Sequence, residues 1–211
     1  MAKHIDFRGG KYDFERTGNL YVRQDPDQTF TPKFAKQLDV GLDLPVKINI
    51  DEIKFANAGE NPDRLRSCIL YPDLRHYIYP DGSKDDPHPF LEVPAHGWAE
   101  IPTGLRIKLP DDAWGFLKSR SSTNWKMHLI IDGSTIDPGY TGQLGVLVYN
   151  PNSYPVRVHE YDPKTGLGDR VAQLILVPVY DLKSIVLVDE LPETSRGITG
   201  FGSSTNHVRT S

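Results

Sequence analysis

Two short polar stretches carry side chains that suit phosphate chemistry. Arg120 stands beside Ser121 and Ser122, and a guanidinium group with two hydroxyl groups offers several donors to phosphate oxygens. Asp137 follows in an Ile-Asp-Pro-Gly-Tyr sequence that ends at Tyr140. These residues place phosphate donors and a carboxylate a short loop apart, although Asp-Pro-Gly taken alone is also a favoured β-turn.

Two later stretches add to this pattern. The sequence Gly168–Gln173 contains Arg170 and is equally typical of a turn before a buried strand, with the arginine paired to a carboxylate. Arg196–Ser204 surrounds one arginine and one phenylalanine with glycines. Glycine lets backbone N–H groups converge on an anion, and the arginine fork matches phosphate oxygens. The same segment also suits a flexible linker.

Several site classes are excluded by spacing. The seven histidines are scattered, and Cys68 is the single cysteine, so neither a zinc site nor a disulfide framework is expected. The chain lacks the Gly-x-Ser-x-Gly elbow of serine hydrolases and the Gly-Lys-Ser/Thr of a Walker loop. Phosphate donors with carboxylates suit Mg²⁺ that is held largely by substrate phosphates and water.

Composition favours one soluble domain. A chain of 211 residues with 38% hydrophobic content can bury one sizeable core. The net charge of −4 is spread along the chain, so we expect no nucleic-acid partner. No apolar run matches a membrane span or a signal peptide. These features predict a cytoplasmic protein with no membrane contact.

The elements that must position these residues are strands. Residues 1–35 are interpreted as an extension on the core, and residues 57–97 as an inserted hairpin or long loop. Alternation through Val46, Ile48 and Ile50 predicts a strand, with Asp43 at the turn before it. Further strands are predicted at 98–101, 105–109, 114–118, 129–132, 143–149, 156–159, 171–179 and 185–188.

The remaining segments are one turn and one tail. A helical turn is predicted at 122–127, capped by Ser122 and packed through Trp125. The Gly- and Ser-rich residues 191–211 are typical of a mobile tail. Many short strands without a 3.6-residue repeat predict an all-β sandwich or barrel.

Five blocks, in this order, resemble the homotrimeric dUTPases across roughly residues 40–204. The blocks are Val40–Val46, Lys118–Ser122, Gly133–Val146, Gly168–Leu174 and Arg196–Ser204. The resemblance implies one jelly-roll domain over residues 1–204 and a homotrimer with active sites at subunit interfaces. It also implies Mg²⁺-dependent hydrolysis of dUTP to dUMP and pyrophosphate, which lowers dUTP and supplies dUMP for thymidylate synthesis.

The resemblance also implies a role for each matched residue. Asp137 would activate the water that attacks the α-phosphorus, and Tyr140 would lie under the deoxyribose and exclude a 2′-hydroxyl. The uracil would bind the main chain of Ser134, Thr135, Ile136 and Gly145. The phosphates would contact Arg120, Ser121, Ser122, Gln173, Arg196, Gly202, Ser203 and Ser204. Phe201, on a tail from a neighbouring subunit, would stack on the uracil, and Asp43 would orient water around Mg²⁺.

Two alternatives stay open. The dCTP deaminases share the fold and the Ile-Asp-Pro-Gly hairpin, but they carry a glutamate proton shuttle where this chain has Leu147.

The dUTPase family commonly has Gly-Val where this chain has Ser134 and Thr135, which bears on the pocket width. The long insertion resembles phage-encoded members, and it suggests a second role in binding a regulatory protein.

Overall fold

Short antiparallel strands make up nearly all the regular structure of the computed structural model, as the sequence predicts. The structure describes residues 18–24, 32–36, 39–49, 52–61, 65–67, 89–132, 135–180, 185–190 and 192–193. All the described strands lie in one contact unit, residues 1–179, and residues 180–211 form a second. No helix in these ranges is long and apolar enough to cross a membrane.

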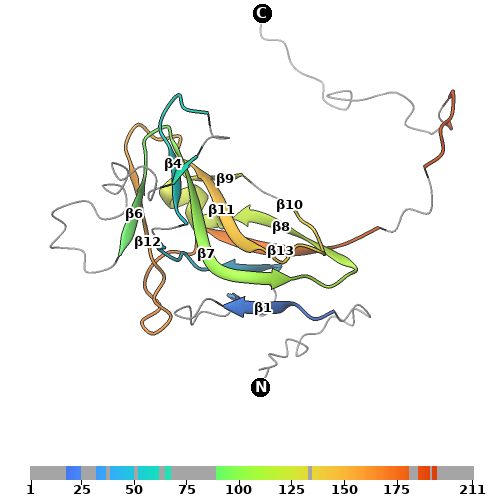
Figure 1. Cartoon of the computed structure of the whole chain (residues 1–211), viewed down its shortest axis with the longest axis horizontal. Coiled ribbons are helices and arrows are strands. Elements are labelled where there is room, and N and C mark those ends of the chain that lie inside the picture. The colour runs from blue at the N-terminus through green and yellow to red at the C-terminus, as the bar shows by residue number, and fades with distance from the viewer. Residues whose placement is uncertain are drawn as a thin grey trace, which may run out of the picture. The chain divides into compact units, whose positions relative to one another are not determined.

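The larger sheet is built around β7 (Trp98–Lys108), which pairs with three strands. Its order is β5 (Arg66–Ser67), β4 (Lys54–Ala56), β7, β11 (Gln143–Tyr149) and β9 (Ile130–Asp132), with β1 (Tyr21–Gln24) along the end of β7. The two strands predicted at 98–101 and 105–109 are therefore one, which curves strongly in Figure 1.

The curve of β7 coincides with a bulge in its partner. Pairing between β7 and β11 shifts register between Gln143 and Gly145, and Gly104 has φ of 67°. The buried Thr103 hydroxyl donates to the Leu144 carbonyl at 2.7 Å. This side-chain bond satisfies a main-chain acceptor at the bulge, so the strand continues through a Pro-Thr-Gly sequence that predicted a break.

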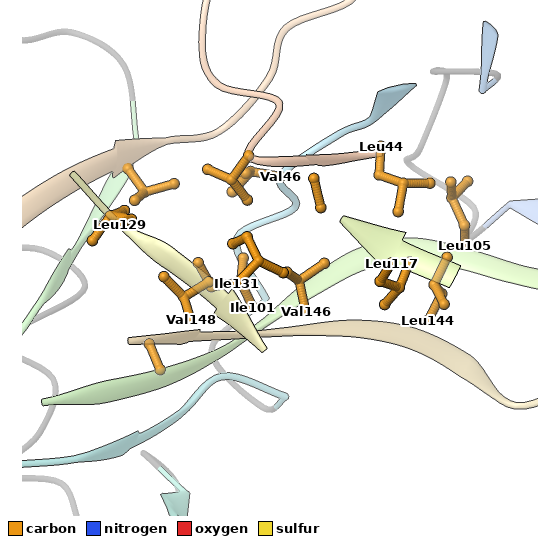
Figure 2. Packing of buried hydrophobic residues seen from close by; sticks show 14 of the residues in the cluster. Leu44, Val46, Ile101, Leu105, Leu117, Leu129, Ile131, Leu144, Val146 and Val148 are labelled. Atoms are coloured by element: carbon orange, nitrogen blue, oxygen red, sulfur yellow. The ribbon is translucent and has the colours of Figure 1, made fainter. Parts of the chain in front are cut away.

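The second sheet faces the first across the core. Its order is β10 (Thr135–Ile136), β8 (Ala113–Ser119), β13 (Ala172–Pro178), β3 (Gly41–Leu44) and β2 (Lys33–Phe34). Leu44 and Leu117 from this sheet meet Ile101, Val146 and other apolar side chains of the first sheet between the ribbons (Figure 2). The two sheets form a β-sandwich with one apolar core.

One strand of a small third sheet lies in the range that was interpreted as an insertion. Strand β6 (Phe90–Val93) pairs with β12 (Val156–His159), and Leu91 and Val93 are fully buried. The end of the 57–97 range therefore belongs to the core. Most of the rest of that range, 62–64 and 68–88, lies outside the described residues.

Three local predictions were wrong. Asp43 does not sit at a turn: it lies inside β3, and residues 45–49 form no strand, consistent with the lack of an N–H at Pro45. The helical turn η3 (Thr123–Met127) exists, but Ser122 makes no side-chain cap and Trp125 is 81% exposed. Residues 185–188 form no strand, and their apolar side chains are exposed rather than packed.

The turn before β13 gives a stability prediction. Gly168 has φ of 92°, and a Cβ atom there would lie 2.0 Å from the Glu160 carbonyl oxygen. We expect Gly168→Ala to lower the free energy of unfolding by about 2 to 3 kcal/mol, from backbone strain and the clash. Gly166→Ala is the control, because φ there is 75° with nothing within 4 Å, and about 1 kcal/mol is expected. Equal losses in urea denaturation would contradict the clash.

Candidate active site

The Asp137 segment is a β-turn, and it also presents a free carboxylate. The Tyr140 N–H donates to the Asp137 carbonyl at 3.0 Å, which closes the turn. The Tyr140 hydroxyl donates to the Gln143 carbonyl at 2.6 Å and so fixes the ring against the next strand. The Asp137 side chain is exposed, and within the described part of the chain no hydrogen bond or ion pair engages its carboxylate. The predicted β-turn is therefore confirmed, and the catalytic role of Asp137 stays a prediction.

The two arms of this hairpin belong to different sheets. Strand β10 pairs with β8, whereas β11 pairs with β7 and, only from Leu147 to Tyr149, with β9. Among the described strands, the edge of β11 from Gln143 to Val146 that faces away from β7 has no partner. An unpaired edge presents main-chain N–H and C=O groups, which is what a planar, hydrogen-bonding ligand needs.

A cavity of about 390 Å³ occupies this hairpin. It brings together Asp137, Tyr140 and the predicted base contacts Thr135, Ile136 and Gly145. Ile136 is buried and Thr135 is exposed. The cavity thus brings together the residues that were predicted to contact uracil, the residue predicted to contact the deoxyribose and the predicted catalytic aspartate.

Five lining residues were not predicted as contacts. They are Leu65, Glu100, Gln143, Leu144 and Leu147. Leu65 comes from the predicted insertion, and no motif in that segment predicts that Leu65 lines the pocket. Alternation along β7 puts Trp98 and Glu100 on the face opposite the buried Ala99 and Ile101, but the sequence does not show that this face meets the pocket.

A second cluster gathers the other predicted side chains. Asp43 is 3% exposed and lies between two arginines, with Oδ1 2.7 Å from Arg120 Nε and Oδ2 2.9 Å from Arg170 Nη1. The Arg170 guanidinium also stacks 5.2 Å from the Tyr161 ring centroid. Two guanidinium groups around one carboxylate leave a net positive charge at a partly exposed surface, which suits a phosphate.

Gln173 and the two serines lie beside this arginine cluster. Gln173 pairs with Asp43 across β13 and β3, and its amide donates to the Ser119 carbonyl at 3.2 Å. Gly41 leaves room for it, since a Cβ atom there would lie 2.2 Å from Gln173 Oε1. Ser121 is exposed and Ser122 half-buried, immediately after Arg120.

The two clusters are far apart in a single chain. Ile136 pairs with Gly115, and the chain runs on to Asp137 in the direction away from Arg120. Arg120 lies five residues beyond Gly115, just past the end of β8, which is roughly 15 Å or more at about 3.3 Å per residue. One chain therefore does not bring Arg120 to the Asp137 pocket.

Six predicted contacts lie outside the described residues: Ser134, Arg196, Phe201, Gly202, Ser203 and Ser204. Their roles stay predictions. Among the described residues no group of three or more acidic, histidine or cysteine side chains could hold a metal ion. Both oxygens of Asp43 are occupied by arginines, so its part in magnesium binding also stays a prediction.

The facing sheets and the hairpin pocket define an all-β sandwich of the jelly-roll type, and solved structures support this fold. A dUTPase of Staphylococcus bacteriophage 80alpha with dUpNHpp is 23% identical, with a TM-score of 0.56 over 89% of this chain and 99% of that chain. A mutant dUTPase from phage phi11 of S. aureus gives a TM-score of 0.52 at 21% identity, over 82% and 97%.

The sequence comparisons identify the family. The dUTPase family model matches residues 90–205. The deoxyuridine 5′-triphosphate nucleotidohydrolase of Solanum lycopersicum is 35% identical over 82% of this chain and 90% of its own length. The chain therefore belongs to the dUTPase family. It spans 59% of the mitochondrial enzyme of Dictyostelium discoideum, at 40% identity over 54% of this chain, and 63% of the Arabidopsis thaliana enzyme, at 37% over 54%.

Proposed function

We propose that this protein hydrolyses dUTP to dUMP and pyrophosphate. The proposal rests on the carboxylate of Asp137 in the hairpin cavity, which has no hydrogen-bond or ion-pair partner among the residues that the structure describes. The carboxylate takes a proton from water as the water oxygen bonds to the α-phosphorus, and the bond from that phosphorus to the bridging oxygen breaks to release pyrophosphate. The reaction lowers dUTP and supplies dUMP for thymidylate synthesis.

The pocket suits a deoxyribonucleotide. The open edges of β10 and β11 offer main-chain donors and acceptors for uracil, including those of Thr135, Ile136 and Gly145. The Tyr140 ring, fixed through its hydroxyl to Gln143, lies under the deoxyribose and leaves no space for a 2′-hydroxyl. A buried main-chain donor or acceptor left unpaired by the wrong base costs binding energy.

The arginine cluster is proposed to bind the triphosphate. Arg120 with Ser121 and Ser122 contacts the phosphates, and Gln173 assists. Asp43 and Arg170 then act as positioning residues that hold the Arg120 guanidinium in place. Arg196 and the serines of the tail complete the grip on the γ-phosphate, and Phe201 stacks on the base.

A homotrimer with shared active sites is proposed because Asp137 and Arg120 lie far apart on one chain. Half-buried Trp114 and Phe116 of β8 pair with Ile175 and Val177 of β13 on the outer face of the second sheet. This apolar face supports burial against another copy.

Mg²⁺ is proposed to be held by the phosphates of the nucleotide and by water, since the described residues form no site of their own. When bound, it supplies positive charge that offsets the phosphates. A structural Mg(II) ion is named for the related dUTPase of phage phi11. We also propose a cytoplasmic location.

The assay compares products. Purified protein with Mg²⁺ is expected to release pyrophosphate from dUTP and much less from UTP, dCTP or dTTP. A dCTP deaminase is the second candidate, because Glu100 lies directly opposite Leu147 in the pocket. Ammonia from dCTP without pyrophosphate from dUTP would replace the proposal with that activity.

Shared sites predict complementation between inactive variants. Asp137→Asn and Arg120→Ala chains are each expected to lose turnover. When co-expressed, they should regain about a quarter of wild-type activity per trimer, because random assembly unites both intact residues in about one site in four. No recovery in isolated mixed trimers would mean that each site uses one chain.

A further inference from the structure

The face of the larger sheet that points away from the core carries an ion pair beside the nucleotide pocket. Lys54, Glu100 and Leu147 lie directly opposite one another on β4, β7 and β11. Lys54 Nζ lies 2.7 Å from Glu100 Oε2. Residues directly opposite on neighbouring strands share a face of the sheet, so the glutamate is flanked by a cation on one side and an apolar side chain on the other.

The second oxygen of Glu100 faces the pocket. A Cβ atom on Gly145 would lie 3.1 Å from Glu100 Oε1, and both residues line the cavity that contains Asp137. Within the described ranges, Oε1 accepts no hydrogen bond. Because Gly145 has no side chain, the carboxylate occupies the space above its backbone.

The position of Glu100 along the pocket determines which part of a bound nucleotide it can contact. Tyr140 bonds to Gln143, whereas Leu147, opposite Glu100, lies four residues further along β11, roughly 13 Å at about 3.3 Å per residue. In a pyrimidine nucleotide the sugar joins N1, and the 4-substituent lies at the opposite end of the ring. With the sugar on Tyr140 and the ring extended along β11, the 4-substituent would lie near Gly145 and Glu100.

We propose that Glu100 is a specificity-determining residue that reads the 4-position of the pyrimidine; this rests on the proposed function. An ionised carboxylate only accepts hydrogen bonds, so it attracts a 4-amino group and repels a 4-oxo group. Lys54 offsets the negative charge of the carboxylate, which reduces its repulsion of the 4-oxo group of uracil. The main chain of the hairpin favours uracil, and the Lys54–Glu100 pair adjusts how strongly the pocket prefers dUTP over dCTP.

The test is the ratio of dissociation constants for the α,β-imido analogues of dCTP and dUTP. Glu100→Gln has the same size and offers an N–H to a 4-oxo group, so the ratio should rise about tenfold, or about 1.4 kcal/mol. Lys54→Met leaves the carboxylate uncompensated, so the ratio should fall. A purely structural role of the pair would weaken both analogues equally in both variants.

Glu92→Gln is the matched control, because Glu92 pairs with Arg157 across β6 and β12 at 3.1 Å and does not line the pocket. Its ratio should equal that of the wild type. Unchanged ratios in Glu100→Gln and Lys54→Met, with normal binding of the dUTP analogue, would overturn the role of Glu100 alone. Failure of the wild-type protein to bind or hydrolyse the uracil nucleotide would instead overturn the proposed function.

Discussion

Asp137→Asn is expected to lower the turnover of dUTP by roughly two or more orders of magnitude, the range that general-base catalysis contributes. Asparagine has the same shape as aspartate, but its amide cannot take a proton from water. The turn should survive, since its hydrogen bond runs from the Tyr140 N–H to the main-chain carbonyl of residue 137. The dissociation constant of the dUTP analogue should therefore change little while single-turnover release of pyrophosphate collapses.

A matched control lies at the end of β9. Asp132 is an exposed carboxylate on β9 that does not line the cavity, so Asp132→Asn should retain wild-type turnover. A loss of substrate binding in Asp137→Asn, equal in size to the loss of turnover, would count against a role in proton transfer. Normal turnover would remove Asp137 as the base.

Asp43→Asn is expected to give the largest loss of stability, about 3 to 5 kcal/mol in the free energy of unfolding, the usual cost of removing one partner from a buried ion pair. Asp43 is 3% exposed and contacts both Arg120 and Arg170. Both arginine side chains are about a quarter exposed, at 23% and 25%, so partial hydration favours the lower end of this range.

Denaturation in urea measures this effect, and Asp111→Asn is its control. Asp111 pairs with Lys108 at 2.8 Å, but its side chain is 91% exposed, so water screens the pair and Asp111→Asn should change stability little. Similar losses in the two variants would show that the Asp43 cluster adds no more than a surface ion pair. Weaker binding of the dUTP analogue should accompany the Asp43 change, because Arg120 loses its anchor.

Features that depend on neighbouring residues were predictable from the sequence. The turn at Asp137 follows from Asp-Pro-Gly, and β11 and β12 have the predicted bounds because polar and apolar residues alternate cleanly along them. The division of the hairpin between two sheets was not predictable, since β10 has only two residues and takes its place from pairing with β8.

Most features that could not be predicted from the sequence depend on pairing between residues far apart in the chain. Asp43 was predicted at the turn before a strand, but its partners Arg120 and Arg170 are far along the chain. Glu100 became a pocket residue only when β4, β7 and β11 were side by side. The apolar run at 185–188 resembles a strand, yet its side chains are exposed, because composition alone cannot say whether a partner strand is present.

A uracil nucleotide is proposed to bind between β10 and β11 with Asp137 facing the α-phosphorus. A crystal structure of the protein with the α,β-imido analogue of dUTP and Mg²⁺ tests it most directly. We predict uracil on the main chain of Ile136 and Gly145, an Asp137 oxygen hydrogen-bonded to a water in line with the α-phosphorus, and Arg120 of another copy on the phosphates. Uracil bound elsewhere, with no Asp137 oxygen near that water, would contradict this mode of binding and the role of Asp137.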